Sequence, residues 1–241
     1  MSYGKRNNCP FYKTELNGIG VKMTHILFDC PNTEDFVNEL SPYLKAGSKV
    51  TVVPFSFYDD AVYDAESFNR LFGEGGICYW ETVRGLAPFG IDKKDIVFIN
   101  YFTDTKEEAR AKVESADVIY FTGGLPDRMM DRIKEFELEN ALLSHTGVVM
   151  GYSAGAVIQL GEYHLSPDGD YPEFGYYSGL PYLDSFYLEV HYEYKPTQDE
   201  AVKRVLGERK KPVYVTHTRL GGIVVDDGNI KTVGKVDVYY P

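Results

Sequence analysis

Short apolar runs alternate with amphipathic segments along most of this chain, and this alternation constrains its fold more than any other feature. The runs have strand length and are rich in Val, Ile and Phe, whereas the segments between them repeat apolar residues every three or four positions. Strands that alternate with helices favour a mostly parallel sheet with helices on both faces. We therefore predict a three-layer α/β fold with strands at residues 25–28, 49–55, 95–101, 117–122, 148–151, 186–192 and 213–216.

Helical periodicity marks most of the segments between the predicted strands. Residues 161–181 are rich in Gly, Pro, Tyr and Asp, which predicts a long loop or an irregular hairpin. Residues 222–226 and 230–233 flank Asp227-Gly228-Asn229, a combination that predicts a terminal β-hairpin. Helical segments are predicted at residues 33–45, 60–72, 77–86, 106–115, 126–143 and 197–209, with a further helix directly after Ser153.

Length and composition limit the class of protein. A chain of 241 residues favours one α/β domain over residues 1–241, with residues 1–22 as an N-terminal extension because their structural signals are weak. The net charge of −11 argues against a nucleic-acid partner, which needs a basic surface. No apolar run approaches the length of a membrane span, and the polar start lacks a signal-peptide core. We expect a cytoplasmic protein without a membrane partner, and homo-oligomerisation stays open.

The three cysteines show no spacing that is typical of a metal or disulfide framework. Cys9, Cys30 and Cys78 form no CxxC pair, and their number is odd. Reduced thiols are therefore expected, together with no resident metal.

A serine stands where a predicted strand turns sharply into a predicted helix. The apolar run that starts at Val148 ends in Gly151-Tyr152-Ser153-Ala154-Gly155, and a helix-compatible run follows. Small residues at both ends of the turn allow the strand and the helix to approach closely, as a nucleophile turn requires. Ser153 would then face free N–H groups at a helix start. The alternative interpretation is a tight turn in which Ser153 only caps the helix.

A second turn of this kind follows the preceding predicted strand. Residues 117–122 lead into Gly123-Gly124 and then a helix with Pro126 in its first turn. Ligands collect at the carboxyl ends of parallel strands, so both turns are expected at one edge of the sheet. The N–H groups of Gly124 and Ala154 could together form an oxyanion hole. Alternatively, the two glycines serve only the backbone conformation of a helix start.

A catalytic serine also needs a base, and five histidines are available. His25 and His145 are predicted to be structural, and His164 lies in the loop after the serine helix. His191 and His217 each lie near the end of a predicted strand. Position alone does not choose between these two.

Three motifs together resemble the peptidase E family of serine peptidases, which includes aspartyl dipeptidase and cyanophycinase. They are Phe-Thr-Gly-Gly at 121–124, Gly-Tyr-Ser-Ala-Gly-Ala at 151–156 and His191-Tyr192. The resemblance covers about residues 49–192 and implies a fold like that of class I glutamine amidotransferases. It also implies that Ser153 is the nucleophile, His191 the base, and the N–H groups of Gly124 and Ala154 the oxyanion donors. Asp168 would orient the histidine, and neither a metal nor an organic cofactor is implied.

Two positions depart from the pattern of this family. Leu125 stands where members usually have Asn or another polar residue, and Arg219 stands in a region where related enzymes often carry an acid. If that acid normally orients the histidine, Asp168 or Glu189 must serve instead. Four cations, Arg128, Arg132, Arg219 and Lys195, could meet a substrate carboxylate, and the sequence assigns none of them a role.

The sequence thus predicts a serine-dependent hydrolase of small peptides, a dipeptidase acting on aspartyl or other acidic dipeptides. Two alternatives stay open. One is a catalytically silent relative that binds a small ligand or a partner. The other is an esterase of the α/β-hydrolase type with Ser153, Asp184 and His217, whose order along the chain also fits.

Overall fold

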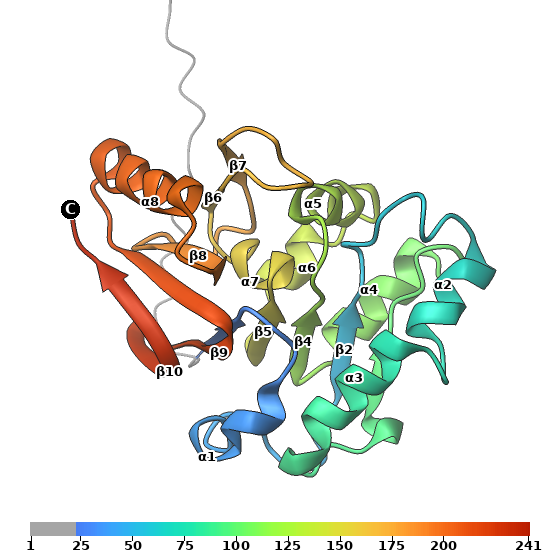
Figure 1. Cartoon of the computed structure of the whole chain (residues 1–241). Helices are drawn as coiled ribbons and strands as arrows, with labels where there is room; N and C mark the ends of the chain where they lie inside the picture. The colour runs from blue at the N-terminus through green and yellow to red at the C-terminus, as the bar shows by residue number, and fades with distance from the viewer. Residues whose placement is uncertain (1–22) are drawn as a thin grey trace, which may run out of the picture.

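A mostly parallel sheet forms the centre of the computed structural model, which describes residues 23–241 (Figure 1). The strand order is β10-β9-β1-β5-β4-β2-β3, and β8 pairs with β9. All pairs among β1 to β5 are parallel, as is β8 with β9, whereas β9 runs antiparallel to both β1 and β10. The strands are β1 (Thr24–Phe28), β2 (Val50–Val53), β3 (Ile96–Phe98), β4 (Val118–Phe121), β5 (Val148–Tyr152), β8 (Tyr187–Tyr192), β9 (Val213–Asp226) and β10 (Asn229–Tyr239).

Helices cover both faces of this sheet, which confirms the predicted three-layer α/β class. One core cluster joins Val83 and Leu86 of α3 to alternate strand residues such as Val52 and Tyr120. A second core cluster lies on the other face of the sheet. It contains the strand residues that point to that face, together with residues of helices α4 to α7. The helices are α1 (Val37–Leu40), α2 (Ala65–Phe72), α3 (Ile77–Leu86), α4 (Lys106–Glu114), α5 (Pro126–Glu135), α6 (Glu139–Leu143), α7 (Ala154–Val157) and α8 (Pro196–Arg209), with 3₁₀ turns η1 (Thr33–Phe36), η2 (Ala87–Phe89) and η3 (Lys93–Asp95).

The central strands are apolar at consecutive positions because both of their faces are covered. Every residue of β1, β2 and β4 is buried. In the part of the chain that the structure describes, no helix combines the length and apolar composition that a bilayer span requires.

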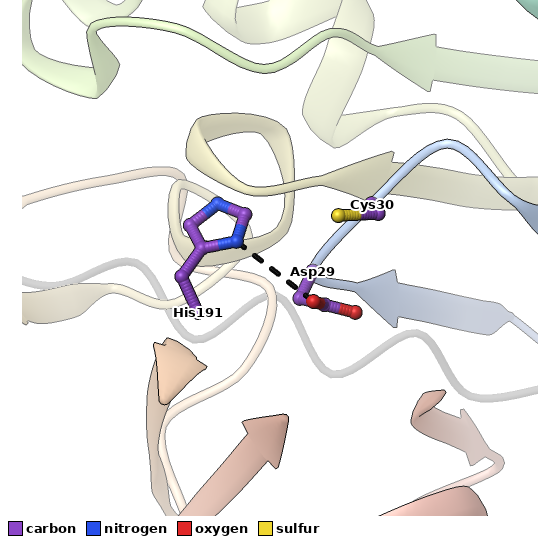
Figure 2. Close-up of side chains that lie close together, drawn as sticks. All are labelled: Asp29, Cys30 and His191. Carbon is purple, nitrogen blue, oxygen red and sulfur yellow. Dashed lines mark ion pairs between the residues drawn. The ribbon is translucent and has the colours of Figure 1, made fainter. Parts of the chain in front are cut away.

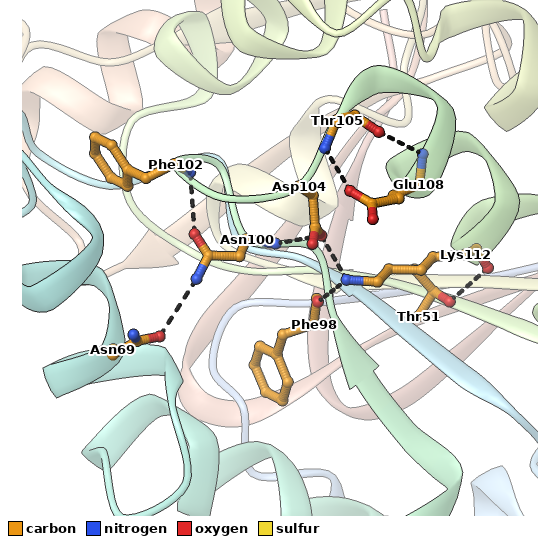
Figure 3. A network of polar contacts seen from close by, with 9 residues as sticks. All are labelled: Thr51, Asn69, Phe98, Asn100, Phe102, Asp104, Thr105, Glu108 and Lys112. Carbon is orange, nitrogen blue, oxygen red and sulfur yellow. Dashed lines mark hydrogen bonds and ion pairs between the residues drawn. The ribbon is translucent and has the colours of Figure 1, made fainter.

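A polar network fixes the chain between β3 and α4 (Figure 3). Thr105 and Glu108 form a reciprocal capping box at the start of α4, the pairing that satisfies the first free N–H groups of a helix. Lys112 of the same helix donates to Asp104 Oδ2 at 2.5 Å and to the carbonyl of Phe98 at 3.1 Å. These contacts attach α4 to the carboxyl end of β3.

The structure corrects three predicted elements. The helix predicted over residues 126–143 is two helices, because Glu137 has a left-handed backbone (φ 56°). The N–H groups of Glu137 and Leu138 donate to the carbonyls of Lys134 and Ile133, the Schellman pattern that ends a helix. Residues 213–216 and 222–226 belong to the one strand β9, and the helix predicted at 33–45 shrinks to η1 and α1.

Two hairpins lie in the C-terminal third. The segment predicted as a loop or irregular hairpin contains β6 (Glu162–Leu165) and β7 (Gly175–Ser178), which pair antiparallel. The terminal hairpin is confirmed, since β9 and β10 meet at Asp227 and Gly228 with φ values of 51° and 76°. Positive φ at both central residues is typical of a type I′ turn. The extension predicted at residues 1–22, which includes Cys9, lies outside the described residues.

Candidate active site

Ser153 occupies a strained turn between β5 and α7. Its backbone has φ 53° and ψ −117°, a region that a residue with a side chain adopts only when its surroundings impose it. The Ser153 N–H donates to the carbonyl of Phe28 at 2.9 Å, which fastens the turn to the end of β1. A Cβ atom on Gly151 would lie 2.3 Å from the Gly155 carbonyl oxygen, and one on Gly155 would lie 2.3 Å from that of Phe121. Both glycines therefore permit the close approach that the sequence predicted.

The hydroxyl of Ser153 faces an imidazole. His191 Nε2 lies 2.8 Å from Ser153 Oγ, a hydrogen-bonding distance. The Ser153 side chain makes no capping hydrogen bond to α7, so the interpretation of Ser153 as a helix cap is wrong. The structure thus brings together the two residues that the sequence proposed as nucleophile and base.

A β-bulge in β8 aims His191 at the serine. The pairing of β8 with β9 shifts register between Glu189 and Tyr192, and His191 itself has φ 55°. Gln198 of α8 fixes this irregular stretch, because its Nε2 donates to the His191 carbonyl at 3.0 Å and its Oε1 accepts from the Glu193 N–H at 2.9 Å. Bulges commonly redirect a side chain next to an active site.

The carboxylate beside His191 belongs to Asp29, which the sequence reasoning missed. Asp29 directly follows β1 and is fully buried. Its Oδ2 lies 3.8 Å from His191 Nδ1 (Figure 2) and accepts the Arg219 N–H at 2.7 Å. Its Oδ1 has no hydrogen-bond partner among residues 23–241. Burial raises the pKa of Asp29, while the Arg219 amide and His191 act in the opposite direction.

Asp168 lines the same cavity as His191, but its carboxylate binds its own loop. It belongs to the loop between β6 and β7, where its Oδ1 accepts the N–H groups of Asp170 at 2.9 Å and Tyr171 at 2.8 Å. The structure, which describes both residues, records no ion pair between Asp168 and His191 within 4.0 Å. This arrangement is the turn chemistry that a Ser-Pro-Asp-Gly-Asp segment favours.

The predicted oxyanion donors lie beside the serine. Gly124 and Ala154 line the same cavity as Ser153 and His191. Gly124 has φ 136°, and a Cβ atom there would lie 2.2 Å from the Ser56 carbonyl oxygen, so only glycine fits. Ala154 is the first residue of α7, and N–H groups in a first helical turn have no acceptor within the helix.

Ser56, which the sequence reasoning did not identify, holds the Gly-Gly turn in place. Its hydroxyl lies 2.9 Å from Thr122 Oγ1 and donates to the Gly123 carbonyl at 2.5 Å. Its carbonyl accepts the Leu125 N–H at 2.7 Å. Ser56 follows the end of β2, the neighbour of β4, so its place at a strand end was a usable signal.

The other polar residues considered from sequence are engaged elsewhere. His217 Nε2 lies 2.7 Å from Asp237 Oδ2, which directs its ring to the terminal hairpin. Glu189 is buried and bonded to His164 Nε2 at 2.8 Å and to Ser166 Oγ at 2.8 Å. Arg132 is buried too, with its guanidinium bonded to the carbonyls of Phe55 and Phe57. These three side chains therefore support the fold around the site.

A cavity of about 590 Å³ opens in front of Ser153, within the size range of small-molecule sites. Asp168, Asp170, Glu193 and Lys195 line it, as does Tyr58, whose hydroxyl donates to Asp170 at 2.6 Å. Lys195 Nζ pairs with Glu193 at 2.8 Å. Of the four cations proposed from sequence, Lys195 is the one that lines this cavity.

Residues 31–231 match the model of peptidase family S51. This chain belongs to peptidase family S51. The match confirms the resemblance to peptidase E seen in the sequence, and it begins after Asp29 and Cys30. Comparison with curated protein sequences gives no match.

Two solved structures share the fold of this S51 chain. A protein from Listeria monocytogenes EGD-e, provisionally classed as peptidase E, has a TM-score of 0.63 at 18% identity, with 89% of this chain and 99% of that one covered. A peptidase from an acI-B1 Actinobacterium has a TM-score of 0.60 at 16% identity, with 91% and 89% covered. At these identities the likeness concerns the fold.

At both departures from the family pattern, the contact to the site in this S51 chain comes from the backbone. Leu125 is the residue before α5, and its N–H is bound by Ser56. Arg219 uses its backbone rather than its side chain, because its N–H holds the Asp29 carboxylate. Asp29, the residue after β1, therefore lies next to Arg219 of β9, where the family pattern predicted an acid.

Proposed function

We propose that this chain is a serine peptidase in which Ser153 attacks the substrate carbonyl and His191 acts as general base. The observation that carries the proposal is the 2.8 Å contact between His191 Nε2 and Ser153 Oγ at a strained turn. Strained backbone conformations of this kind cluster at active sites. Membership of a peptidase family supports amide hydrolysis over other acyl transfers.

The arrangement suits the two-step chemistry of serine hydrolases. His191 Nε2 accepts the hydroxyl proton as Ser153 Oγ bonds to the carbonyl carbon, and the carbonyl oxygen becomes an oxyanion. The N–H groups of Gly124 and Ala154 stabilise that charge. His191 then donates the proton to the leaving amine, which leaves an acyl-enzyme. Water, deprotonated by the same nitrogen, releases the acid and restores Ser153.

We propose Asp29, rather than Asp168, as the positioning residue for His191. A carboxylate next to Nδ1 keeps the proton on that nitrogen and leaves Nε2 free to accept. Asp29 Oδ2 is 3.8 Å away, and catalytic hydrogen bonds often shorten only when substrate binds. The Arg219 N–H already fixes the orientation of this carboxylate.

Small peptides such as dipeptides are the proposed substrates, because a cavity of about 590 Å³ lies within the size range of small-molecule sites. The exposed Lys195–Glu193 pair can exchange partners with a substrate, Lys195 binding the carboxylate that an aspartyl dipeptide carries and Glu193 the free ammonium group, with Asp170 lining the same cavity. A panel of dipeptides with acidic, neutral and basic N-terminal residues tests this preference. Faster hydrolysis of basic than of acidic dipeptides would contradict it.

The decisive experiment combines hydrolysis with labelling by a fluorophosphonate, which reacts with activated serines. The wild-type chain is expected to hydrolyse dipeptides and to carry the label on Ser153, and Ser153→Ala is expected to lose both. Ser166→Ala removes another serine of the same cavity and serves as the control that keeps the label. Full activity of Ser153→Ala, or no labelling of the wild type, would reject the serine mechanism and leave the silent relative as the better interpretation.

A further inference from the structure

His191 forms a cluster of possible metal ligands with two neighbouring residues, apart from its contact with Ser153. Asp29, Cys30 and His191 each offer a ligand atom, and these atoms all lie within 4.8 Å of one another (Figure 2). His191 uses Nε2 toward the serine, so Nδ1 is the nitrogen that faces Asp29. Carboxylate oxygen, thiolate sulfur and imidazole nitrogen form a typical donor set for zinc.

Asp29 is the buried member of this group. Its Oδ2 faces His191 and accepts the Arg219 N–H, and its carboxylate shares a hydrogen bond with the Cys30 thiol, whereas Oδ1 has no hydrogen-bond partner in the described part of the chain. A buried carboxylate oxygen without a partner is costly, and a bound cation is one way to satisfy it. Cys30 has no role in the proposed hydrolytic steps, and it lies outside the family match, which begins at residue 31.

We propose that Asp29, Cys30 and His191 form an inhibitory site for a borderline divalent transition-metal ion such as Zn²⁺. A carboxylate and a thiolate neutralise the two positive charges, the imidazole stays neutral, and solvent supplies the fourth ligand. The Cys30 thiol releases its proton to solvent when its sulfur binds the ion. Tetrahedral ligation at about 2.0–2.3 Å sets ligand atoms about 3.5 Å apart, so side-chain shifts of about 1 Å suffice.

The ion can reach this site from solvent. The side chain of His191 is 42% exposed, and Cys30 is partly exposed, whereas Asp29 forms the floor. Rotation of the two outer side chains therefore does not require the core to open.

Binding at this site switches off the base. An ion on Nδ1 leaves the single proton of a neutral imidazole on Nε2, which then donates to Ser153 Oγ and can no longer accept its proton. The ion also withdraws Asp29 from the histidine. This consequence rests on the proposed serine mechanism, whereas the binding itself does not.

Cobalt binding tests the site without reference to activity. Full-length chain treated with a chelator and then titrated with Co²⁺ is expected to show the near-ultraviolet charge-transfer band of a thiolate bound to cobalt. Cys30→Ser is expected to lose the band, and the matched controls Cys78→Ser and Cys9→Ser are expected to keep it. A wild type without the band, or a band that survives in Cys30→Ser, would overturn the proposal.

Zinc inhibition tests the consequence. Zn²⁺ is expected to suppress both dipeptide hydrolysis and fluorophosphonate labelling, and a chelator is expected to restore them. Cys30→Ser is expected to keep the metal-free activity but to need at least about tenfold more Zn²⁺ for half-inhibition. Equal sensitivity of wild type and Cys30→Ser would reject the inhibitory role. A cobalt band in a chain without any hydrolysis would reject the peptidase and leave the metal site standing.

Discussion

At the residue scale, the site depends on backbone conformations that side chains normally avoid. Ser153 and His191, the two residues in contact, both have positive φ values, of 53° and 55°. Such conformations cost about 1–3 kcal/mol each and persist where the surrounding structure imposes them. Here the Phe28 carbonyl holds one residue and Gln198 holds the other. Two strained residues that face each other are therefore the strongest local indication of function.

Asp29→Asn tests the positioning role. We expect kcat to fall by about 10²–10⁴ with little change in KM, because the amide cannot keep the proton on His191 Nδ1. Asp168→Asn is the matched control and is expected to stay close to wild type, since its carboxylate serves its own loop. Steady-state kinetics on a dipeptide, with thermal unfolding as a check on folding, measures both. The reverse order of effects would return the role to Asp168.

Gly124→Ala tests the oxyanion turn. The new Cβ atom would lie 2.2 Å from the Ser56 carbonyl oxygen and force the turn to shift. Loss of one oxyanion donor typically lowers kcat by about 10²–10³, and we expect a loss of that size. Gly75→Ala places the same methyl group at φ 102° with no atom within 4 Å, so it controls for backbone strain alone. Similar kcat losses in both variants would argue against Gly124 as a donor.

At the element scale, helix ends are decided by single residues. Glu137 ends α5 and Lys210 ends α8, both in the left-handed conformation that glycine adopts without strain. The sequence predicted the end of α8 at Arg209, but it missed the break after α5. Residue 137 is an ordinary glutamate, and the long amphipathic pattern continues beyond it. Burial of Leu138 accompanies the Schellman turn there, and such a contact is visible only in three dimensions.

Lys210→Gly tests the strain at the end of α8. Glycine removes the left-handed penalty, so we expect a gain of about 1 kcal/mol in the free energy of unfolding and a rise of about 2–4 °C in Tm. Lys203→Gly changes the same residue type on an exposed position inside α8 and is expected to lose about 1 kcal/mol. Calorimetry or urea unfolding measures both. A lower stability of Lys210→Gly would show that its backbone is not strained.

At the scale of the whole molecule, the sheet order assembles the site. Asp29, Gly124 and Ser153 follow β1, β4 and β5, which are adjacent and parallel in the sheet. Their carboxyl ends therefore lie along one edge, where ligands of open α/β sheets bind. His191 enters from β8, which is attached through β9. Strand order thus brings four segments of the chain together, and the bulge in β8 then aims His191 at the serine.

Buried histidines couple the stability of the whole fold to pH. Burial lowers the pKa values of His25 and His145 below the ordinary value of 6.5. As the pH falls, these histidines take up protons at a higher pH in the unfolded chain than in the folded chain. The free energy of unfolding therefore falls as the pH drops below about 6.5. Urea unfolding at about pH 7.5 and about pH 5.5 brackets this value. We expect the loss on acidification to be smaller in His145→Gln, and an unchanged loss would assign the pH dependence to other groups.

The sequence by itself determined the local chemistry. The alternation of apolar runs and amphipathic segments predicted the layered sheet, and the glycines around Ser153 and at Gly124 predicted the turns, because backbone sterics act over a few residues. His191 needed the resemblance as well, since a histidine at a strand end is not distinctive. Only the tertiary structure revealed Asp29, because the distance between two side chains depends on strand order and not on local pattern. β1 pairs with β5 across more than one hundred intervening residues, and no short-range rule connects the ends of those two strands.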